Sequence, residues 1–401
     1  MALLYFVSAG GSYLAFSSMN STNSDTALVS PEAMTDEETA AVRSRVNPGE
    51  PKTVSCPING EMFTKSEEQI WATRRPLAVM IENHVDARPQ SGLSNADVVY
   101  ETLAEGGITR FMGIYYCGAA GGDVEVGPVR SARTYFLDWV SEYGENPIYA
   151  HVGGGNCNKE TGSGCANGAK ADAIGQIAKY GWRFYNDIDG LYIGLPVFKR
   201  DNRLEKFTGN QNIAVEHTMY SSTDKLYAEA EKRGLTSVDE DGVAWNSTFV
   251  PWKFKEDSAS ANATATDINY MFWEQFADSY LVDWKYDSAT NRYLRNNGGQ
   301  PHIDLNTEKQ ISAKTVILQV MKESRANDGY ENNIHLLYAN KGTGKAMVFQ
   351  DGTVTEGTWK KADRTSRTVF YDKAGKEIAL NKGQVWISTI PAQSESMIKY
   401  Q

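Results

Sequence analysis

Short apolar runs that end in polar, glycine-containing turns recur between residues 75 and 155, and they constrain the fold more than any other feature. The first run, residues 77–81, leads directly into Glu82, Asn83 and His84. An apolar run of this length is typical of a buried strand, so the polar residues after it mark the strand's end. Because α/β proteins commonly bind ligands at such turns, the pattern predicts a sheet with a binding site at one edge.

The polar residues of these turns form one candidate site. The side chains predicted to bind an anionic ligand are Arg88, Gln90, Arg110, Arg130, Arg133, His151, Glu216 and His217. Glu82, Asn83 and Glu105 add further polar groups. Asp97 and Glu101 are the carboxylates that could hold a metal ion, and Mg²⁺ is the candidate because it prefers oxygen ligands.

Arg130 and Arg133 stand at the start of a helix predicted within residues 132–143, where apolar residues fall on one face. The N-terminus of a helix favours an anion, and two guanidinium groups add forked donors for phosphate or carboxylate. The alternative is that both arginines pair with Asp97, Glu101 or Glu105 and hold the fold together. The spacing favours neither interpretation.

A second polar pair lies further along the chain. Residues 213–219 are predicted to form a strand with Glu216 and His217 near its end, followed by a capped helix over residues 223–233. His217 is a candidate acid, base or ligand, although an isolated histidine is more often a structural residue.

The length of 401 residues exceeds what one hydrophobic core usually supports, so the sequence predicts two domains with tails. Composition divides the chain into an apolar signal or anchor remnant at 1–19, a disordered linker at 20–55, an N-terminal domain at 56–235, a junction loop at 236–266 and a C-terminal domain at 267–401. The first domain is expected to be α/β, or α+β, with a mixed sheet. The second is expected to be smaller and mostly antiparallel, because strand and hairpin patterns dominate it.

The apolar N-terminal segment, residues 2–16, is uncharged but shorter than the roughly 18 residues that a spanning helix needs. Three interpretations compete: a signal anchor that starts further upstream, a cleavable signal peptide without its charged start, and a buried helix. The polar linker that follows favours the first two. We therefore expect an extracytoplasmic protein that is anchored to the membrane through its N-terminus or secreted.

The four cysteines, Cys56, Cys117, Cys157 and Cys165, agree with this location, because an even number in an exported protein usually forms disulfides. The spacing leaves the pairing open. A zinc site of His151, Cys157 and Cys165 is the weaker alternative, since structural zinc sites favour more closely spaced ligand pairs.

The net charge of −10 argues against broad nucleic-acid binding, which depends on basic surface. The glycine-rich segment 342–345 lacks the full spacing of a phosphate-binding loop and is better explained as a hairpin turn. The common nucleotide-binding, serine-hydrolase and zinc-protease motifs are absent from the sequence.

Several blocks of the sequence resemble the YerB-like bacterial lipoprotein family, which pairs an N-terminal and a C-terminal domain of unknown function. The blocks are 76–84, 87–93, 97–101, 105–110, 127–133 and 151–154 in the first half, and 293–295, 299–302 and 345–360 in the second. The resemblance implies an extracytoplasmic, membrane-tethered protein of the cell envelope with no established reaction. Lipoproteins of this family carry a lipidated cysteine just after the signal, whereas Cys56 lies far too late, so we expect the apolar N-terminus itself to be the anchor.

The layout of the polar blocks is similar, more loosely, to that of LytR-CpsA-Psr phosphotransferases, which move cell-wall polymers from polyprenyl pyrophosphate carriers. In this analogy Asp97 parallels a metal-holding acid, and Arg110, Arg130 and Arg133 parallel a phosphate clamp. Likeness of layout alone does not establish chemistry.

Three functions are therefore open. The first is a binding protein for an anionic small molecule or cell-wall polymer, which could also contact envelope proteins. The second is a metal-assisted phosphotransferase acting on polyprenyl-pyrophosphate-linked wall polymers. The third is a non-enzymatic scaffold for envelope enzymes.

Overall fold

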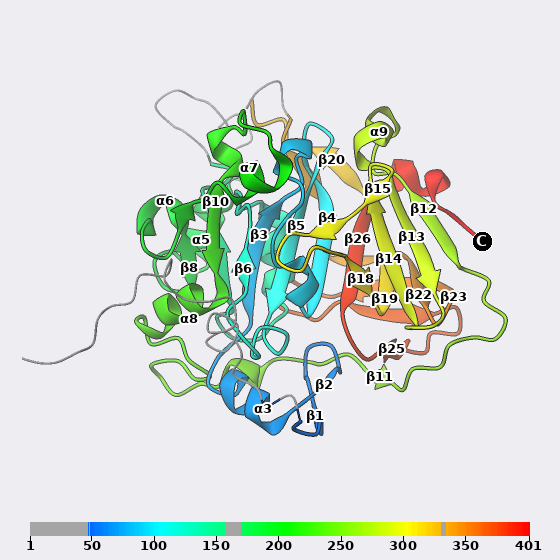
Figure 1. Ribbon diagram of the computed structural model, residues 1–401, viewed down its shortest axis with the longest axis horizontal. Helices are drawn as coiled ribbons and strands as arrows, with labels where there is room; N and C mark the ends of the chain where they lie inside the picture. Colours follow the sequence, from blue (N-terminus) through cyan, green and yellow to red (C-terminus); the bar gives the residue numbers. More distant parts are fainter. Residues whose placement is uncertain (1–46, 48, 157–169, 330–333) are drawn as a thin grey trace, which may run out of the picture. The chain divides into compact units, whose positions relative to one another are not determined.

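The structure is a computed structural model that describes residues 47, 49–156, 170–329 and 334–401 (Figure 1). The predicted apolar segment, nearly all of the predicted linker and two cysteines, Cys157 and Cys165, lie outside these residues. Within the described ranges, no helix has both the length and the apolar character needed to cross a membrane.

A ten-stranded mixed sheet forms the centre of the molecule. In spatial order its strands are β24 (Val369–Asp372), β23 (Thr353–Lys361), β22 (Gly342–Gln350), β19 (Thr315–Met321), β26 (Val385–Pro391), β4 (Val98–Glu105), β5 (Ile108–Tyr115), β3 (Leu77–Glu82), β7 (Ile148–His151) and β8 (Asp187–Asp189). The predicted strand at residues 77–81 is therefore confirmed. Residues 77–81 form one continuous apolar run because both faces of this strand are buried.

Helices and short strand pairs surround the first half of this sheet. The helices are α3 (Lys65–Trp71), α4 (Thr134–Val140), α5 (Ala173–Lys179), α6 (Gly190–Ile193), α7 (Arg203–Thr208) and α8 (Thr223–Glu231). The short strands are β1 (Val54–Ser55) with β2 (Met62–Phe63), and β10 (Met219–Ser222) between β6 (Glu125–Val126) and β9 (Lys199–Arg200). Helix α3 begins with a capping box, in which Thr64 and Glu67 satisfy each other's backbone N–H groups, as its sequence requires.

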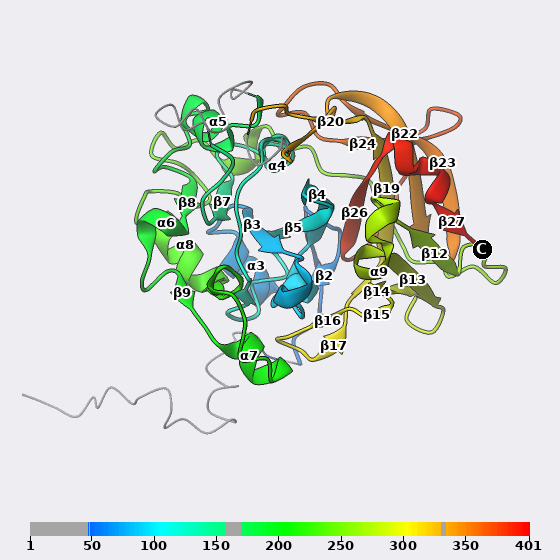
Figure 2. The ribbon, with the colours of Figure 1, turned by 90° about the horizontal axis from the view of Figure 1, so that it is seen from above.

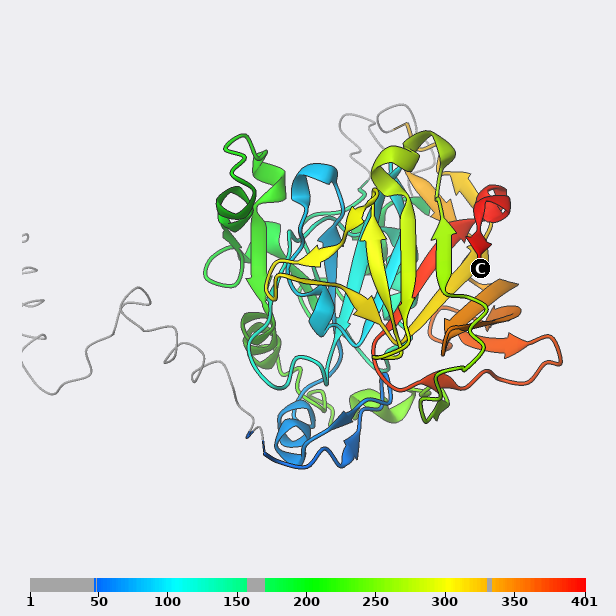
Figure 3. The same ribbon diagram turned by 45° about the vertical axis from the view of Figure 1, so that its right-hand side comes forward.

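The second half is mostly antiparallel, as predicted. Its smaller sheet consists of β15 (Gln300–Pro301), β14 (Arg292–Asn297), β13 (Val282–Asp287), β12 (Asp267–Tyr270) and β27 (Lys399–Tyr400), with β18 (Ser312–Ala313) also paired to β14. The remaining elements are helix α9 (Ala277–Tyr280), the pairs β16 (Ile303–Asp304) with β17 (Lys309–Gln310) and β20 (Glu323–Arg325) with β21 (Leu336–Tyr338), and β11 (Phe254–Lys255) with β25 (Leu380–Asn381). The smaller sheet faces the large one near β26 (Figures 2 and 3). There Trp284 meets Trp386 edge to face with ring centroids 5.4 Å apart.

One strand joins the two halves of the chain. Strand β26 comes from the C-terminal end of the sequence but pairs in parallel with β4, from Val385 opposite Val98 to Ser388 opposite Glu101. Its other edge pairs in parallel with β19. The two domains therefore share one sheet, and the described residues from 47 to 401 form one compact unit.

The predicted strand over residues 213–219 is wrong. Residues Val215–His217 form a 3₁₀ turn, η5, and the strand β10 begins only at Met219. Val215, which a buried strand would cover, is 61% exposed. Strand β10 forms where β6 and β9 supply hydrogen-bond partners on both edges. The predicted helix that follows is confirmed as α8.

A disulfide joins Cys56 to Cys117 and fixes the β1–β2 hairpin to the chain just after β5. The bond closes a long loop, with a sequence separation of 61 residues. Cross-links over long loops restrict the unfolded chain most, so this bond is expected to stabilise the fold by about 4 kcal/mol.

The shared sheet predicts that the first half does not fold alone. A fragment of residues 47–266 lacks β26, so it exposes the edge of β4 and leaves the buried face of the sheet open to water. We expect no cooperative thermal transition by circular dichroism for this fragment, in contrast to residues 47–401. A sharp, reversible transition of the fragment would contradict this prediction.

Candidate functional site

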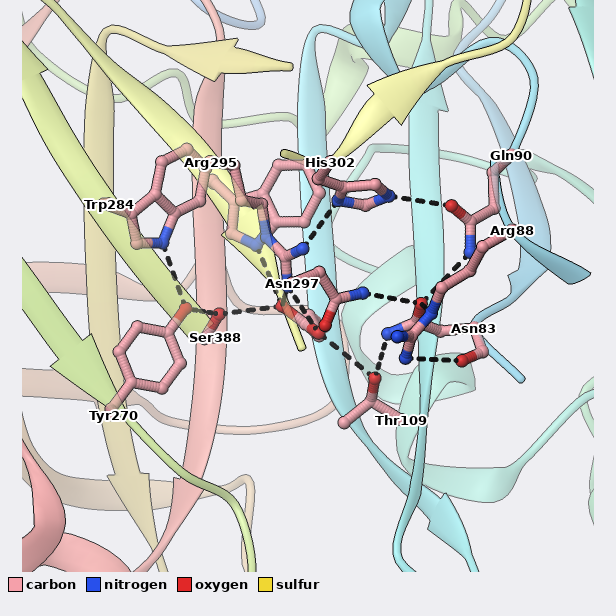
Figure 4. Close-up of polar contacts among 12 residues, drawn as sticks. Asn83, Arg88, Gln90, Thr109, Tyr270, Trp284, Arg295, Asn297, His302 and Ser388 are labelled. Atoms are coloured by element: carbon pink, nitrogen blue, oxygen red, sulfur yellow. Dashed lines mark hydrogen bonds and ion pairs between the residues drawn. The ribbon is translucent and has the colours of Figure 1, made fainter. Parts of the chain in front are cut away.

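A buried polar network lies between the two sheets (Figure 4). Glu101 of β4 is at its centre. Nη2 of Arg295, on β14, donates to both carboxylate oxygens of Glu101 at 2.9 and 2.8 Å. The Glu101 side chain is 1% exposed and the Arg295 side chain is 0% exposed. An ion pair this deep needs further hydrogen bonds to offset the loss of water.

Those further bonds come from both halves of the protein. Thr109 donates to Oε1 of Glu101 at 3.1 Å, while the Trp386 indole and the Ser388 hydroxyl approach Oε2 at 3.2 and 3.3 Å. The network extends to the smaller sheet through Tyr270, whose hydroxyl lies 2.8 Å from that of Ser388.

His302 continues the network towards Gln90. Burial, followed by the charges of Arg295 and Arg88, holds the pKa of His302 well below its usual value, so the ring is neutral. Its Nδ1 accepts from Arg295 at 2.6 Å, so its Nε2–H must donate to the Gln90 carbonyl oxygen at 2.7 Å. The Gln90 amide then donates to the backbone oxygen of Glu82 at 2.9 Å and to Asn83.

Asn83 lies at the other end of the network, where several hydrogen bonds converge on its side chain. Its side-chain oxygen accepts from Arg88 at 2.9 Å, Gln90 at 3.1 Å and Asn297 at 2.9 Å, and its amide donates to Thr109 at 2.6 Å. The structure therefore brings the predicted residues Asn83, Arg88 and Gln90 together, but their polar groups bind one another.

A second cluster surrounds Glu105. Its two oxygens accept from Arg110 at 2.8 Å and from Arg133 at 2.6 Å. Burial alone would raise the pKa of Glu105, but the charges and hydrogen bonds of the two arginines outweigh it and lower the pKa to about 2. Arg133 stands at the N-cap of α4, as predicted, yet its charge is neutralised by Glu105.

A third cluster surrounds Glu82. One carboxylate oxygen forms an ion pair with Nε of Arg130 at 3.0 Å, and the other lies 2.9 Å from Nδ1 of His217. This contact with Glu82 is the main cause that raises the pKa of His217. The Arg130 side chain is 28% exposed, and Glu216 is exposed beside this cluster.

The other candidate residues have partners other than these arginines. His151 is buried, with Nε2 2.5 Å from Asp187 and Nδ1 2.7 Å from the backbone oxygen of Gly153. Asp97 accepts backbone N–H groups from Tyr116, Cys117 and Gly118. Burial raises the pKa of Asp97 to about 7 against the opposing effect of these N–H donors.

The carboxylates proposed for Mg²⁺ do not meet the predicted phosphate clamp. Asp97 lies beside Ile114, at one end of the β4–β5 hairpin, whereas Arg110 pairs with Thr102. Five residues of strand separate these levels, which corresponds to about 17 Å. Both oxygens of Glu101 already accept hydrogen bonds.

An open pocket of about 580 Å³ lies between α4, α5 and the segment that follows β21. Its lining includes three cationic and three aromatic side chains: Lys170, Lys179, Lys341, Tyr135, Tyr180 and Tyr338. Of its two acids, Asp138 pairs with Lys341 at 2.5 Å and Asp172 caps α5 by accepting from Gly175 N–H. We refer to this feature as the lysine–tyrosine pocket.

Two family models match this chain in succession. The model described as "Protein of unknown function (DUF3048) N-terminal domain" matches residues 63–236, and the corresponding C-terminal domain model matches residues 272–387. The chain belongs to the DUF3048 family. The resemblance predicted from the sequence blocks is thereby confirmed.

A curated relative and a solved structure agree with this assignment. The "Putative lipoprotein YerB" of Bacillus subtilis (strain 168) is 28% identical over 344 residues, which cover 86% of this chain and 88% of the relative. The crystal structure of YerB from Bacillus subtilis matches with a TM-score of 0.64 at 25% identity, covering 85% of this chain and 98% of that one.

Several residues of the buried polar network around Glu101 were not predicted as site residues. They come mainly from the second half: Tyr270, Trp284, Arg295, Asn297, His302, Trp386 and Ser388. A usable signal existed in β14, where Tyr293, Arg295 and Asn297 alternate and are buried on one face. A large aromatic residue at the first of these positions places the next two on the same inward side.

The Glu101–Arg295 pair predicts strong coupling between the two domains. Arg295→Met should destabilise the protein by about 3 to 5 kcal/mol in urea denaturation, because it leaves Glu101 buried without its partner. Adding Glu101→Gln should recover part of that loss. Equal losses in the double variant and in the summed single variants would contradict the coupling.

The Glu105 cluster predicts a loss of stability in acid. The folded-state pKa of Glu105, about 2, lies below its ordinary value of 4.5. Its contribution is therefore complete above pH 4.5 and disappears as the pH falls from 4.5 to 2, by up to about 3 kcal/mol. The difference in unfolding free energy between the wild type and Glu105→Gln, measured from pH 7 to pH 2, should narrow over this interval. A constant difference would exclude this role of Glu105.

Proposed function

We propose that this protein is an extracytoplasmic, membrane-tethered protein of the cell envelope that binds an anionic, phosphate- or carboxylate-bearing ligand. The name of the YerB relative as a lipoprotein supports the location, and the Cys56–Cys117 disulfide agrees with an oxidising compartment. The apolar N-terminal segment is the proposed anchor.

The ligand site that we favour is the lysine–tyrosine pocket. The observation that carries this proposal is that neither Lys170 nor Lys179 forms an ion pair within the described part of the chain, although both line a pocket. Lys341 lies on the same pocket and is 47% exposed. Cationic groups without carboxylate partners attract a phosphate or carboxylate into a partly enclosed site.

The predicted arginine site is less favourable for the same ligand. Arg110 and Arg133 already share the carboxylate of Glu105, and Arg130 is paired with Glu82. An incoming anion would have to displace a largely buried carboxylate and leave it without its charged partner, which is costly. For this reason we move the proposed ligand from the arginines to the lysines.

Two alternatives remain as proposals. A metal-assisted phosphotransferase would require a metal beside the arginine clamp, and the separation of Asp97 from Arg110 along the β4–β5 hairpin offers little support for it. A non-enzymatic scaffold would require only a rigid two-domain body, which the closed Glu101 network supports.

The pocket proposal is tested by calorimetric titration of the full-length protein with pyrophosphate and with citrate at low salt. The double variant Lys170→Glu/Lys179→Glu should weaken binding of the better probe by about tenfold or more, because it reverses two attractive charges. Lys232→Glu is a suitable control, since Lys232 is 69% exposed on the edge of α8, away from the pocket lining.

Each other outcome counts against this proposal. Affinity that is unchanged in the double variant but lost in Arg130→Gln would return the ligand to the arginine cluster. Failure of both probes to bind, together with retained stability in all variants, would favour the scaffold.

A further inference from the structure

Two histidines and an aspartate lie together just beyond the end of β3. One potential ligand atom from each of His84, Asp86 and His217 lies within 4.8 Å of the other two. We propose that these three side chains bind a divalent transition-metal ion of the zinc class. The proposal is independent of the lysine–tyrosine pocket, because none of the three residues lines it.

Two 3₁₀ turns bring these residues together. His84 follows β3 and caps η2 (Val85–Ala87) by accepting the Asp86 N–H at its Nδ1. His217 belongs to η5, which is distant in sequence. The rings of His84 and His217 stack with centroids 4.8 Å apart and planes 12° from parallel. The stacked rings therefore connect the turn after β3 with the turn before β10, two segments that are distant in sequence.

Glu82 gives His217 the arrangement of a metal ligand. The carboxylate lies 2.9 Å from Nδ1 of His217, so this nitrogen donates its proton and the lone pair of the neutral ring is at Nε2. Metal-binding histidines usually donate their other N–H to a carboxylate or carbonyl oxygen in this way, which orients the ring. Arg130 holds the second oxygen of Glu82 and keeps the carboxylate in place.

The charge around the rings favours a cation. Glu82, Asp86 and Glu216 bring three negative charges, and Arg130 brings one positive charge. Glu216 is close enough to interact electrostatically with His84, His217 and Arg130. With neutral imidazoles the cluster carries a charge of −2, which a dication would balance. Imidazole nitrogens with one carboxylate suit Zn²⁺, Co²⁺ or Ni²⁺ better than Mg²⁺ or Ca²⁺.

The cluster must contract to bind. Neighbouring ligand atoms around tetrahedral Zn²⁺ are about 3.3 Å apart, so ligand atoms that lie up to 4.8 Å apart have to approach one another by up to about 1.5 Å. Stacked rings do not direct their lone pairs at one point, so His84 must also turn out of the stack. His84 and Asp86 have side chains that are 30% and 56% exposed and can move, whereas His217 is held by Glu82. Solvent can supply the fourth ligand.

The test is titration of the full-length, oxidised protein with Co²⁺ and Zn²⁺. Co²⁺ should produce visible absorption bands typical of a tetrahedral site, at one ion per chain, and Zn²⁺ should abolish them. His84→Ala and Asp86→Asn should weaken binding at least tenfold, and Glu82→Gln by about 10- to 100-fold, the effect typical of removing such a carboxylate. Val85→Ala, between the two ligands in the same turn, should bind as the wild type does.

Three results would overturn the proposal. They are no Co²⁺ bands at millimolar metal, bands that persist unchanged in both His84→Ala and Asp86→Asn, and bands that disappear instead in Cys157→Ser/Cys165→Ser. The test uses variants of His84 and Asp86 because these side chains are partly exposed, so their replacement should leave the protein folded. His217 is not replaced because it is buried.

Discussion

The ion pair between Glu101 and Arg295 is the interaction on which the rest of the structure depends. It joins the central sheet to the smaller sheet in a region that water does not reach. Its desolvation is offset by donors from two further strands, β5 and β26. A second buried pair, Lys361 with Glu142 at 2.8 Å, joins the two halves on another part of the sheet. Separating the two halves would leave the charged groups of both pairs without partners, so the two domains behave as one body.

Local features were predictable from the sequence because local forces decide them. The strands around residues 77–117, the capped helix α3 and the hairpin of β13 and β14 all follow from periodicity, capping and turn residues. The parallel pairing of β26 with β4 was not predictable, because the two strands are separated by most of the chain. A parallel pair leaves no turn signal between its members.

The candidate site was predictable as a set of residue types but not as a set of contacts. Spacing placed arginines and acids at strand ends. In the structure Arg130 pairs with Glu82, and Arg110 and Arg133 share Glu105. Glu101 pairs instead with Arg295, which was not predicted. Strand periodicity indicates which face a side chain occupies but not its partner on another element. Lys170 and Lys179 were not predicted as site residues either, because an exposed lysine in or near a helix resembles any other surface residue.

The position of β26 also determines when the chain can fold during its synthesis. The strand ends at Pro391, close to the last residue, Gln401, yet it occupies the middle of the ten-stranded sheet. The strands of this sheet span residues 77–391, so all of this segment must be synthesised before the sheet can close, and such non-local pairing is slow to form. For the extracytoplasmic location proposed above this delay is an advantage, because an incomplete sheet keeps the nascent chain open enough to be threaded across a membrane.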